Sequence, residues 1–335
     1  MLVRELGEFG LIARLSRRVS ASTAGASQRK EPPLHVRVGI GDDAAVWDTA
    51  GAAEALTTDT IVDGTHFTLA TTGWDDLGWK ALATNLSDIA AMGARPGAAV
   101  VTLGLPPDTR VEDIDALYDG LLEAAAEFGA SVAGGDVVAS PTLFITVALT
   151  GTLQHEPMLR SAARPGDLIA VTGSLGASAA GLAVLQGAST AGRADAKPLL
   201  DAHRRPWPRV AEGAALAEAG VLSAMDITDG LVDDLGKLCA AAGCAARLDA
   251  ACVPVHAAAL AAFPDEAMTM ALNGGEDYEL LFTAPPRLMA SIGSGPACGV
   301  HVVGEIISGT SGEVVVVDDK GNAMAPPRKG WDHFG

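Results

Sequence analysis

The chain has 335 residues, which is enough for two domains of ordinary size, each with its own core. Hydrophobic residues make up 49% of it, a share that is typical of globular proteins and excludes wholesale disorder. The formal net charge of −18 argues against a nucleic-acid-binding protein, because direct neutralisation of phosphates requires clustered Lys and Arg. An acidic protein can still bind polyphosphates when metal ions lie between the two sets of negative charge.

Cysteine spacing and apolar content indicate the compartment. The four cysteines, Cys239, Cys244, Cys252 and Cys298, match no metal-binding or redox spacing, so we interpret them as free thiols in a reducing compartment. The segment 1–10 is charged and lacks the apolar core of a signal peptide. No stretch approaches the roughly 18 apolar residues of a membrane span. We therefore expect a cytoplasmic protein that does not enter a membrane.

In the first half, strands and helices are predicted to alternate. Leu11, Ile12, Leu15 and Val19 recur at helical spacing, and a Ser-, Ala- and Gly-rich loop follows from Ser20 to Pro33. The expected strands are Val36–Ile40, Ala55–Thr58, Ala98–Leu105, Ala130–Ala133 and Thr142–Leu149. The expected helices are Trp74–Met92 and Val111–Phe128.

The second half is predicted to alternate again. We place the domain boundary between residues 155 and 156, ahead of the turn signal Arg164-Pro165-Gly166-Asp167. Strands are expected at Leu168–Thr172, Glu279–Thr283, His301–Ile307 and Glu313–Val317. Helices are expected after Gly176, after Pro208 and at Asp229–Ala242. Mixed strands and helices in both halves predict α/β or α+β domains rather than a helical bundle.

Aspartates recur beside glycines and hydroxyl residues, in short apolar settings. The runs are Gly41-Asp42-Asp43, Thr57-Thr58-Asp59-Thr60, Asn85-Leu86-Ser87-Asp88, Gly134-Gly135-Asp136 and Asp226-Ile227-Thr228-Asp229-Gly230. Hard oxygen ligands of this kind suit Mg²⁺, which usually accompanies a phosphorylated substrate. In α/β folds, ligands gather where strand ends meet loops. Five such runs, most at predicted element ends, together indicate a site for divalent cations.

Each run also has a structural alternative. Gly-Asp pairs favour turns, which by itself is the better interpretation of Asp42 and an open one for Asp136. Asp229 is a good N-cap residue for the helix that follows, in addition to any metal role. Asp88 is harder to explain structurally, because a carboxylate on an apolar helix is costly unless it is paired or binds a metal.

Missing motifs narrow the chemistry. The sequence has no GxxxxGK[ST] loop, no protein-kinase catalytic-loop or DFG motif and no GxSxG elbow. An enzyme acting on phosphates would therefore depend on metals, backbone amides and a few Arg side chains.

The acidic runs, taken in order with four further motifs, resemble those of the thiamine-monophosphate kinase family, in the superfamily that includes aminoimidazole ribonucleotide synthetase. The further motifs are Arg164-Pro165-Gly166-Asp167, Val171-Thr172-Gly173, Gly274-Gly275-Glu276-Asp277-Tyr278-Glu279-Leu280 and the tail Lys329-Gly330-Trp331-Asp332-His333-Phe334-Gly335. The likeness runs nearly end to end. The Gly-Gly-Glu-Asp-Tyr run and the tail are the motifs that point to this member of the superfamily.

The resemblance implies a two-domain PurM-like fold and an ATP-dependent conversion of thiamine monophosphate to thiamine diphosphate. The N-terminal α/β domain, residues 1–155, would have a mixed sheet that pairs with a partner's sheet as a barrel in a homodimer, and the C-terminal domain, residues 156–335, would be an α+β sandwich. Several Mg²⁺ ions would be bound by Asp42, Thr57, Thr58, Asp59, Asp88, Asp136, Asp226 and Asp229. ATP would contact Tyr118, Gly135, Arg160 and Thr228. The thiamine part would contact His66, Glu276 and Trp331.

The expected mechanism is direct transfer. The phosphate of thiamine monophosphate has its second pKa near ~6, so it is already largely deprotonated at neutral pH and requires no catalytic base from the protein. The protein would position the phosphates and neutralise their charge through Mg²⁺. Arg160 would offer a forked donor to a phosphate, although a surface Arg near a turn is its structural alternative.

Three other functions stay open. Another ATP- and Mg²⁺-using PurM-like synthetase would share the metal and ATP residues but not the thiamine residues. A non-catalytic sensor of Mg-nucleotide would be stabilised by its ligand without releasing ADP. A metal-dependent phosphatase would release inorganic phosphate from ATP without thiamine monophosphate. Selenophosphate synthetase is disfavoured, because no reactive Cys lies near the N-terminus.

Overall fold

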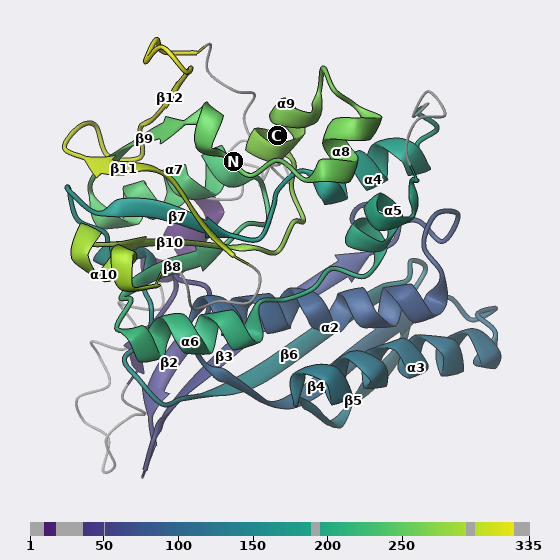
Figure 1. Cartoon of the computed structure of the whole chain (residues 1–335). Coiled ribbons are helices and arrows are strands. Elements are labelled where there is room, and N and C mark those ends of the chain that lie inside the picture. The colour runs from purple at the N-terminus through teal and green to yellow at the C-terminus, as the bar shows by residue number, and fades with distance from the viewer. Residues whose placement is uncertain (1–9, 18–35, 50, 189–194, 293–298, 325–335) are drawn as a thin grey trace.

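The computed structural model describes residues 10–17, 36–49, 51–188, 195–292 and 299–324, and these form two sheets with helices packed against each (Figure 1). Residues 10–17 form a short helix. The expected loop from Ser20 to Pro33, the residues Cys298 and Trp331 and the tail motif lie outside the described residues. Within them, no helix is long and apolar enough to cross a membrane.

The first sheet has six strands in the order β1-β2-β3-β6-β4-β5. Their bounds are β1 Val36–Val38, β2 Ala45–Asp48, β3 Ala53–Val62, β4 Arg95–Leu105, β5 Ser131–Ala139 and β6 Phe144–Leu153. The sheet is mixed, because β4 and β5 run parallel whereas the other neighbours are antiparallel. Strand β6 alternates half-buried and buried residues, which is typical of a strand with one face on a core.

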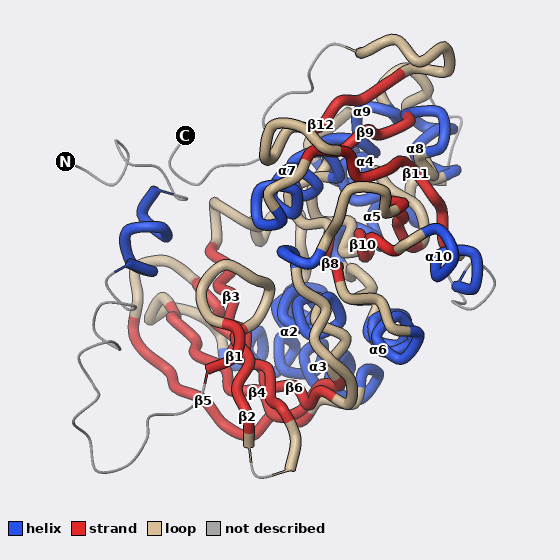
Figure 2. Tube along the Cα trace, turned by 90° about the vertical axis from the view of Figure 1, so that its left-hand side faces the viewer, coloured by secondary structure: helices blue, strands red, loops and turns tan. Residues whose placement is uncertain are grey.

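Two 18-residue helices, α2 (Trp74–Ala91) and α3 (Val111–Phe128), cover one face of this sheet (Figure 2). They pack closely because each has a glycine at the contact. A Cβ at Gly78 would lie 1.8 Å from the carbonyl oxygen of Leu117, and a Cβ at Gly120 would lie 1.8 Å from that of Asp75. A side chain at either glycine would therefore separate the helices.

The second sheet also has six strands, in the order β12-β9-β11-β7-β10-β8. Their bounds are β7 Leu168–Thr172, β8 Ser223–Asp226, β9 Ala245–Asp249, β10 Leu280–Ala284, β11 Val300–Ile307 and β12 Val314–Val317. The helices of this part are α4 Ala177–Leu185, α5 Lys197–Arg204, α6 Val210–Ala219, α7 Leu231–Ala242, α8 Ala257–Ala262, α9 Ala267–Asn273 and α10 Pro286–Ile292, with short 3₁₀ turns η1 Arg160–Ala162 and η2 Ala250–Cys252.

Helix α2 lies between the two sheets and faces both (Figure 1). Leu82, Leu86 and Ile89 belong to the core of the first sheet, while Ala90 and Ala91 join a separate core with Leu280 and Phe282 of the second half. Because helix α2 is enclosed on both sides, polar residues such as Asn85 and Ser87 are fully buried.

The mixed α/β first part and the α+β second part confirm the expected fold class. Helix α3 and strand β7 have the bounds predicted from the sequence. The largest omissions are β2, β8, β9 and the short helices α5, α8, α9 and α10, which have too few residues for a clear hydrophobic period. Helix α8 packs by its apolar residues in a small core with α4 and α5.

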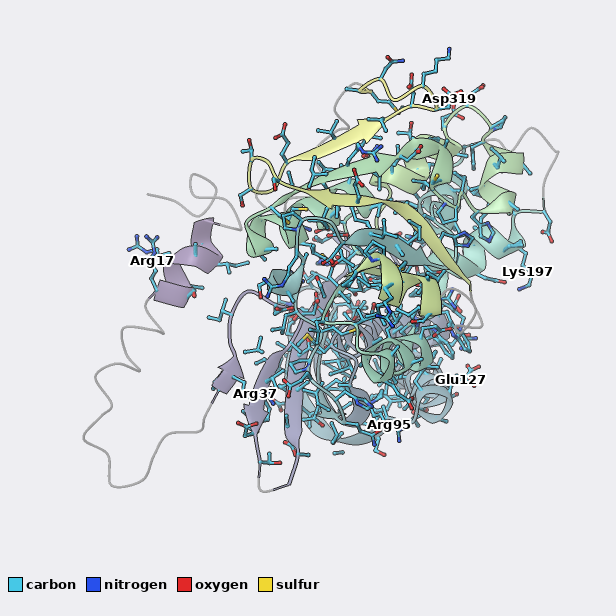
Figure 3. The ribbon with its side chains drawn as sticks, turned by 60° about the vertical axis from the view of Figure 1, so that its left-hand side comes forward. Arg17, Arg37, Arg95, Glu127, Lys197 and Asp319 are labelled. Atoms are coloured by element: carbon cyan, nitrogen blue, oxygen red, sulfur yellow. The ribbon has the colours of Figure 1, made fainter. Side chains whose placement is uncertain are left out.

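Charged side chains lie mainly at the periphery. Arg95, Glu127 and Lys197 are exposed at the outer surface of the molecule (Figure 3). The buried charges are concentrated where α2 meets the second half of the chain, and they define the candidate site.

Candidate functional site

Three carboxylates from separate parts of the chain converge where the two halves meet. Asp43 lies just before β2, Asp88 lies in the last turn of α2 and Asp226 ends β8. Each offers an oxygen, and these oxygens lie within 4.8 Å of one another. We call Asp43, Asp88 and Asp226 the carboxylate cluster.

Hydroxyl groups hold two of these carboxylates in place. The Thr57 hydroxyl of β3 donates to Asp88 Oδ2 at 2.5 Å, and the buried Ser87 hydroxyl donates to Asp226 Oδ2 at 2.6 Å. Because Ser87 is on α2 and Asp226 on β8, the second bond ties the two halves of the protein together. Asp59 lies beside the cluster, and its backbone N–H donates to Asn85 Oδ1 at 3.1 Å.

Burial and mutual repulsion make this cluster electrostatically unfavourable. Burial raises the pKa of Asp88 well above its ordinary value, and the neighbouring Asp59, Asp226 and Asp43 add to the shift. The pKa of Asp226 is raised well above its ordinary value mainly by burial and then by Asp43. Such shifts mean that the ionised carboxylates lack enough positive charge nearby. A bound cation would supply it.

Arg160 is the guanidinium at this cluster. Its Nη2 donates to Asp43, and its backbone N–H lies 3.4 and 3.3 Å from the two carboxylate oxygens of Asp42. Burial lowers the pKa of Arg160, but the attraction and hydrogen bond to Asp43, together with the charges of Asp226 and Asp42, outweigh burial. The net shift is upward, so the side chain stays charged. Arg160 Nε and Asp43 Oδ2 are both buried and have no hydrogen-bond partner among the residues that the structure describes.

The donor set fits Mg²⁺. Every candidate ligand is a carboxylate or hydroxyl oxygen, the type that Mg²⁺ prefers. The unpartnered Asp43 Oδ2 is a buried acceptor that a cation would satisfy.

Sequence reasoning selected Asp42 and passed over Asp43. Asp42 is half-buried and turns toward Arg160, and burial followed by repulsion from Asp43 raises its pKa to about 6. Asp43, with its side chain fully buried, is the residue that joins the carboxylate cluster. The Gly41-Asp42-Asp43 run supplied both candidates, and no pattern in it showed which carboxylate points inward.

A second acidic group lies at the start of α7. Asp229, Asp233 and Asp234 offer oxygens within 4.8 Å of one another, and Lys237 contacts all three. The prediction that Asp229 caps α7 is wrong, because the N-cap residue is Gly230. The fully buried Asp234 satisfies the backbone of this turn instead. Its Oδ2 accepts hydrogen bonds from the backbone N–H groups of residues 228, 229 and 230 at 2.9, 2.9 and 3.1 Å. Asp234 thereby fixes the loop that carries Thr228 and Asp229.

Asp136 and Gly135 lie away from the carboxylate cluster. The paired residues Asp59, Val147, Val101 and Gly135 form one row across β3, β6, β4 and β5, so Asp59 and Gly135 are three strands apart, about 14 Å at ~4.8 Å per strand. Asp136, the next residue, points to the opposite face of the sheet and is exposed. A Cβ at Gly135 would lie 1.8 Å from the carbonyl oxygen of Val101, so strand pairing by itself requires this glycine.

The other expected residues are placed as follows. Thr58 points away from α2, since its neighbours Thr57 and Asp59 point toward it, and its hydroxyl donates to the carbonyl of Val147 at 2.9 Å. Tyr118 is half-buried on α3, packed against the core of the first sheet. His66 is half-buried after β3, and its Nδ1 accepts from the backbone N–H of Val62 at 3.1 Å.

Glu276 lies in a strained loop that is bonded to the segment holding the metal candidates. Glu276 and Tyr278 have φ values of 63° and 52°, and they are the only non-glycine residues with positive φ among those described. Left-handed conformations cost a non-glycine residue roughly 1–2 kcal/mol, so surrounding contacts must impose them. The backbone N–H of Glu276 donates to the carbonyl of Thr228 at 2.8 Å, and that of Tyr278 to the carbonyl of Ile227 at 3.0 Å.

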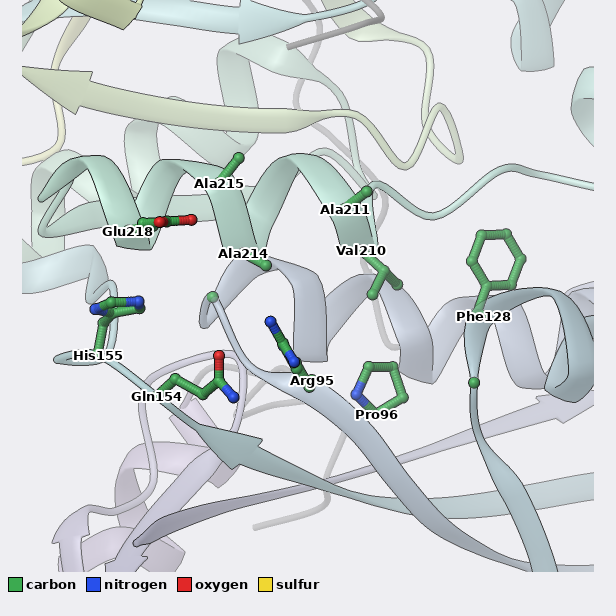
Figure 4. Close-up of a pocket in the computed structure, with 12 residues that line it drawn as sticks. Arg95, Pro96, Phe128, Gln154, His155, Val210, Ala211, Ala214, Ala215 and Glu218 are labelled. Atoms are coloured by element: carbon green, nitrogen blue, oxygen red, sulfur yellow. The ribbon is translucent and has the colours of Figure 1, made fainter. Parts of the chain in front are cut away.

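A surface groove of about 520 Å³ lies elsewhere, between α6 and the start of β4 (Figure 4). Arg95, Gln154, His155 and Glu218 are its polar side chains. It includes none of the residues expected in the site, and the cluster described above is the better candidate for the chemistry.

The chain matches family models in both halves. Residues 41–153 match the model of the AIR synthase related protein N-terminal domain, and residues 164–317 match that of the C-terminal domain. Thiamine-monophosphate kinase of Escherichia coli strain K12 is 38% identical over 339 residues, which cover 98% of each chain. The enzyme of that name from Mycobacterium tuberculosis strain H37Rv is 34% identical over 99% of this chain and 93% of its own.

Solved structures agree with these relatives. The structure described as AaThiL complexed with AMPPCP and TMP has a TM-score of 0.84 and 30% identity, and the match covers 99% of each chain. Thiamine-monophosphate kinase from Stenotrophomonas maltophilia K279a has a TM-score of 0.74 and 34% identity, with 92% of this chain and 96% of that chain covered. With its fold and its relatives over nearly the full length in agreement, this chain belongs to the thiamine-monophosphate kinase family.

Proposed function

We propose that this protein is a kinase that uses ATP to phosphorylate thiamine monophosphate, giving thiamine diphosphate. The observation that carries the proposal is the convergence of Asp43, Asp88 and Asp226 beside Arg160, in a chain related over its full length to kinases of that name. A structure of a relative with AMPPCP and TMP supports both substrates.

The reaction needs little covalent chemistry from the protein. A phosphate oxygen of thiamine monophosphate attacks the γ-phosphorus of ATP in line, the bond to the β,γ-bridging oxygen breaks and ADP leaves. The attacking phosphate is largely ionised near neutral pH, because its second pKa is ~6, so no side chain has to remove a proton. When bound, Mg²⁺ would neutralise the charge of the phosphates.

Each side chain is proposed to have a role that follows from its position. Asp43, Asp59, Asp88 and Asp226 would hold Mg²⁺, with the Thr57 hydroxyl orienting Asp88. Arg160 stays charged and has a buried N–H without a partner in the described part of the chain, which it could donate to a phosphate.

The expected residues outside this group have separate places in the proposal. Asp229 and Thr228 would contact metal and nucleotide from the loop that Asp234 fixes. Gly135, Asp136 and Tyr118 could contact only parts of a ligand remote from the carboxylate cluster. His66, Glu276 and Trp331 are proposed to contact thiamine.

The finer expectations are several Mg²⁺ ions, a cytoplasmic location and a homodimer. The sheet face opposite α2 and α3 supports a homodimer, because exposed Leu56, Val100 and Val138 lie on it, in strands β3, β4 and β5. We propose that this face packs against the same face of a second copy of the chain, because both subunits of an isologous dimer use the same surface.

The test mixes the protein with Mg²⁺ and ATP, with and without thiamine monophosphate, and separates the products by chromatography. Thiamine diphosphate and ADP should form in equal amounts, only when all components are present. Inorganic phosphate without thiamine diphosphate would identify a phosphatase. Thermal stabilisation by Mg-ATP without ADP would identify a sensor. Turnover of a different substrate only would favour another synthetase of the superfamily.

A pair of variants tests the metal role. Asp59→Asn should abolish turnover and retain the wild-type circular dichroism spectrum, because Asn is a poorer ligand of the same shape. Asp48→Asn, an exposed carboxylate on neighbouring β2, is the control and should retain full activity. Near-normal turnover of Asp59→Asn would contradict the metal role.

A further inference from the structure

A buried lysine contacts Glu276 from the other half of the protein. Lys80 is on α2 and only 2% exposed, and lysine is seldom fully buried without a paired charge. Its Nζ lies 2.9 Å from each carboxylate oxygen of Glu276 and donates to the carbonyl of His203 at 3.2 Å. Lys80 is therefore clamped between helix α5 and the Gly-Gly-Glu loop.

His203 completes the contact from the same side. Its Nδ1 lies 3.0 Å from the Ser178 hydroxyl and 3.3 Å from Glu276 Oε2. Burial, followed by Lys80, lowers the pKa of His203 to about 4, so the ring is neutral at neutral pH. Lys80 is then the cation that pairs with Glu276, and the His203 ring supports the carboxylate without adding charge.

These contacts are made by a residue, Glu276, whose backbone conformation is strained. Glu276 has a left-handed φ of 63°, and its side chain stays 28% exposed, so it is still partly open to a ligand. An unrestrained glutamate has several rotamers and would relax from such a backbone, whereas a buried ammonium bonded to both oxygens permits one orientation. The direction of the carboxylate is thereby set by α2, the helix that also carries Asp88.

We propose that Lys80 is a positioning residue for thiamine recognition, which holds the Glu276 carboxylate toward the substrate. This inference rests on the proposed function, because Glu276 is there assigned to thiamine. Lys80 does not itself touch substrate. It acts through Glu276, so its loss should impair binding of thiamine monophosphate and spare that of ATP.

The test compares steady-state kinetics of Lys80→Met, Glu276→Gln and the double variant, varying each substrate in turn. Lys80→Met should raise KM for thiamine monophosphate about tenfold and change KM for ATP less than about twofold. The double variant should be no worse than Glu276→Gln alone, because one residue acts through the other.

Arg205→Met is the matched control. Arg205 joins the same two halves through Glu123 and Asp76 and lies over the Trp79 ring, 4.5 Å from its centroid, but it has no contact with Glu276. Its loss should lower thermal stability and leave both KM values unchanged. A merely structural Lys80 would behave in the same way.

The outcomes separate this inference from the proposed function. If wild-type protein forms no thiamine diphosphate, the proposed function fails. If wild type is active and Lys80→Met keeps the wild-type KM for thiamine monophosphate, or raises both KM values equally, the positioning role is overturned. If Lys80→Met does not fold, the double variant, which lacks both charges, is compared with Glu276→Gln, and a further rise in KM for thiamine monophosphate would overturn the role.

Discussion

At the residue scale, the site is built from carboxylates that destabilise the protein in which they lie. Asp226 is buried and Asp88 half-buried, their pKa values are raised, and their neighbours carry the same charge. Groups of this kind persist where function requires them, at the expense of stability. Removing a charge from the carboxylate cluster should therefore raise the stability of the metal-free protein and lower its activity.

Asp88→Asn tests that opposition. Replacing one carboxylate of the cluster by an uncharged amide of the same shape should raise the unfolding free energy of the metal-free protein by about 1–2 kcal/mol. The same change should lower turnover at least ~100-fold, because charge stabilisation at the phosphates is lost. Thermal unfolding without Mg²⁺ and product formation with it measure the two effects. Reduced metal-free stability together with full turnover would contradict this view of the cluster.

His203 gives a pH dependence of stability with a defined sign. Its pKa is about 4 in the folded protein and 6.5 ordinarily, because burial, followed by Lys80, disfavours the charged ring. The unfolded chain therefore binds more protons between these values, and the stability contributed by neutral His203 is present above pH 6.5 and lost as pH falls toward 4. From pH 7 to pH 5 this group should cost wild type roughly 1–2 kcal/mol.

Urea unfolding of wild type and His203→Asn at pH 7 and pH 5 isolates this contribution. The raised carboxyl pKa values act in the opposite direction in both proteins, so only the difference between the proteins is informative. His203→Asn should lose less stability on acidification than wild type does. Equal losses would show that the ring takes up a proton in the folded state.

At the element scale, the loop between β8 and α7 depends on one side chain. Asp234 accepts three backbone N–H groups and pairs with Lys237 while fully buried. Asp234→Ala should cost about 2–4 kcal/mol of unfolding free energy, because it leaves these donors without an acceptor. It should also raise KM for ATP, since the loop carries Thr228 and Asp229.

Asp233→Ala is the control for that loop. Asp233 lies one residue away and contacts Lys237 at 2.9 Å from a partly exposed position. Its removal should cost under ~1 kcal/mol and leave KM for ATP unchanged. Denaturant unfolding and steady-state kinetics of both variants measure these effects. Similar losses of unfolding free energy and similar changes in KM for ATP in the two variants would refute the special role of Asp234.

At the scale of the whole molecule, the exposed apolar residues on the sheet face opposite α2 and α3 predict the assembly. Light scattering should give about twice the chain mass of 33.9 kDa. Val100→Lys combined with Val138→Lys should give monomers, because both side chains are exposed on that face and would become charged. Val111→Lys, at a still more exposed valine on α3, should stay dimeric. A monomeric wild-type protein at micromolar concentration would rule out the proposed dimer.

Much of the architecture could be predicted from the sequence because its signals are local. Helix α3 repeats apolar residues at helical spacing, and strand β7 follows a turn signal, so both were predicted at their observed bounds. The oxygen-rich runs indicated a site for a hard cation before any distance was known, although the structure places those at Asp59, Asp88 and Asp136 inside β3, α2 and β5 rather than at element ends. The motif order was enough to indicate the family.

Tertiary structure alone decided which carboxylates meet. Asp43 rather than Asp42 points into the carboxylate cluster, and Asp136 lies on the far face of its sheet, because side-chain direction depends on strand register and on neighbours distant in sequence. The contact between Lys80 and Glu276 joins residues 196 positions apart, and no local sequence pattern around either residue indicates that they meet. A sequence specifies which groups are available, whereas the packing of two domains on one helix determines which of them share a site.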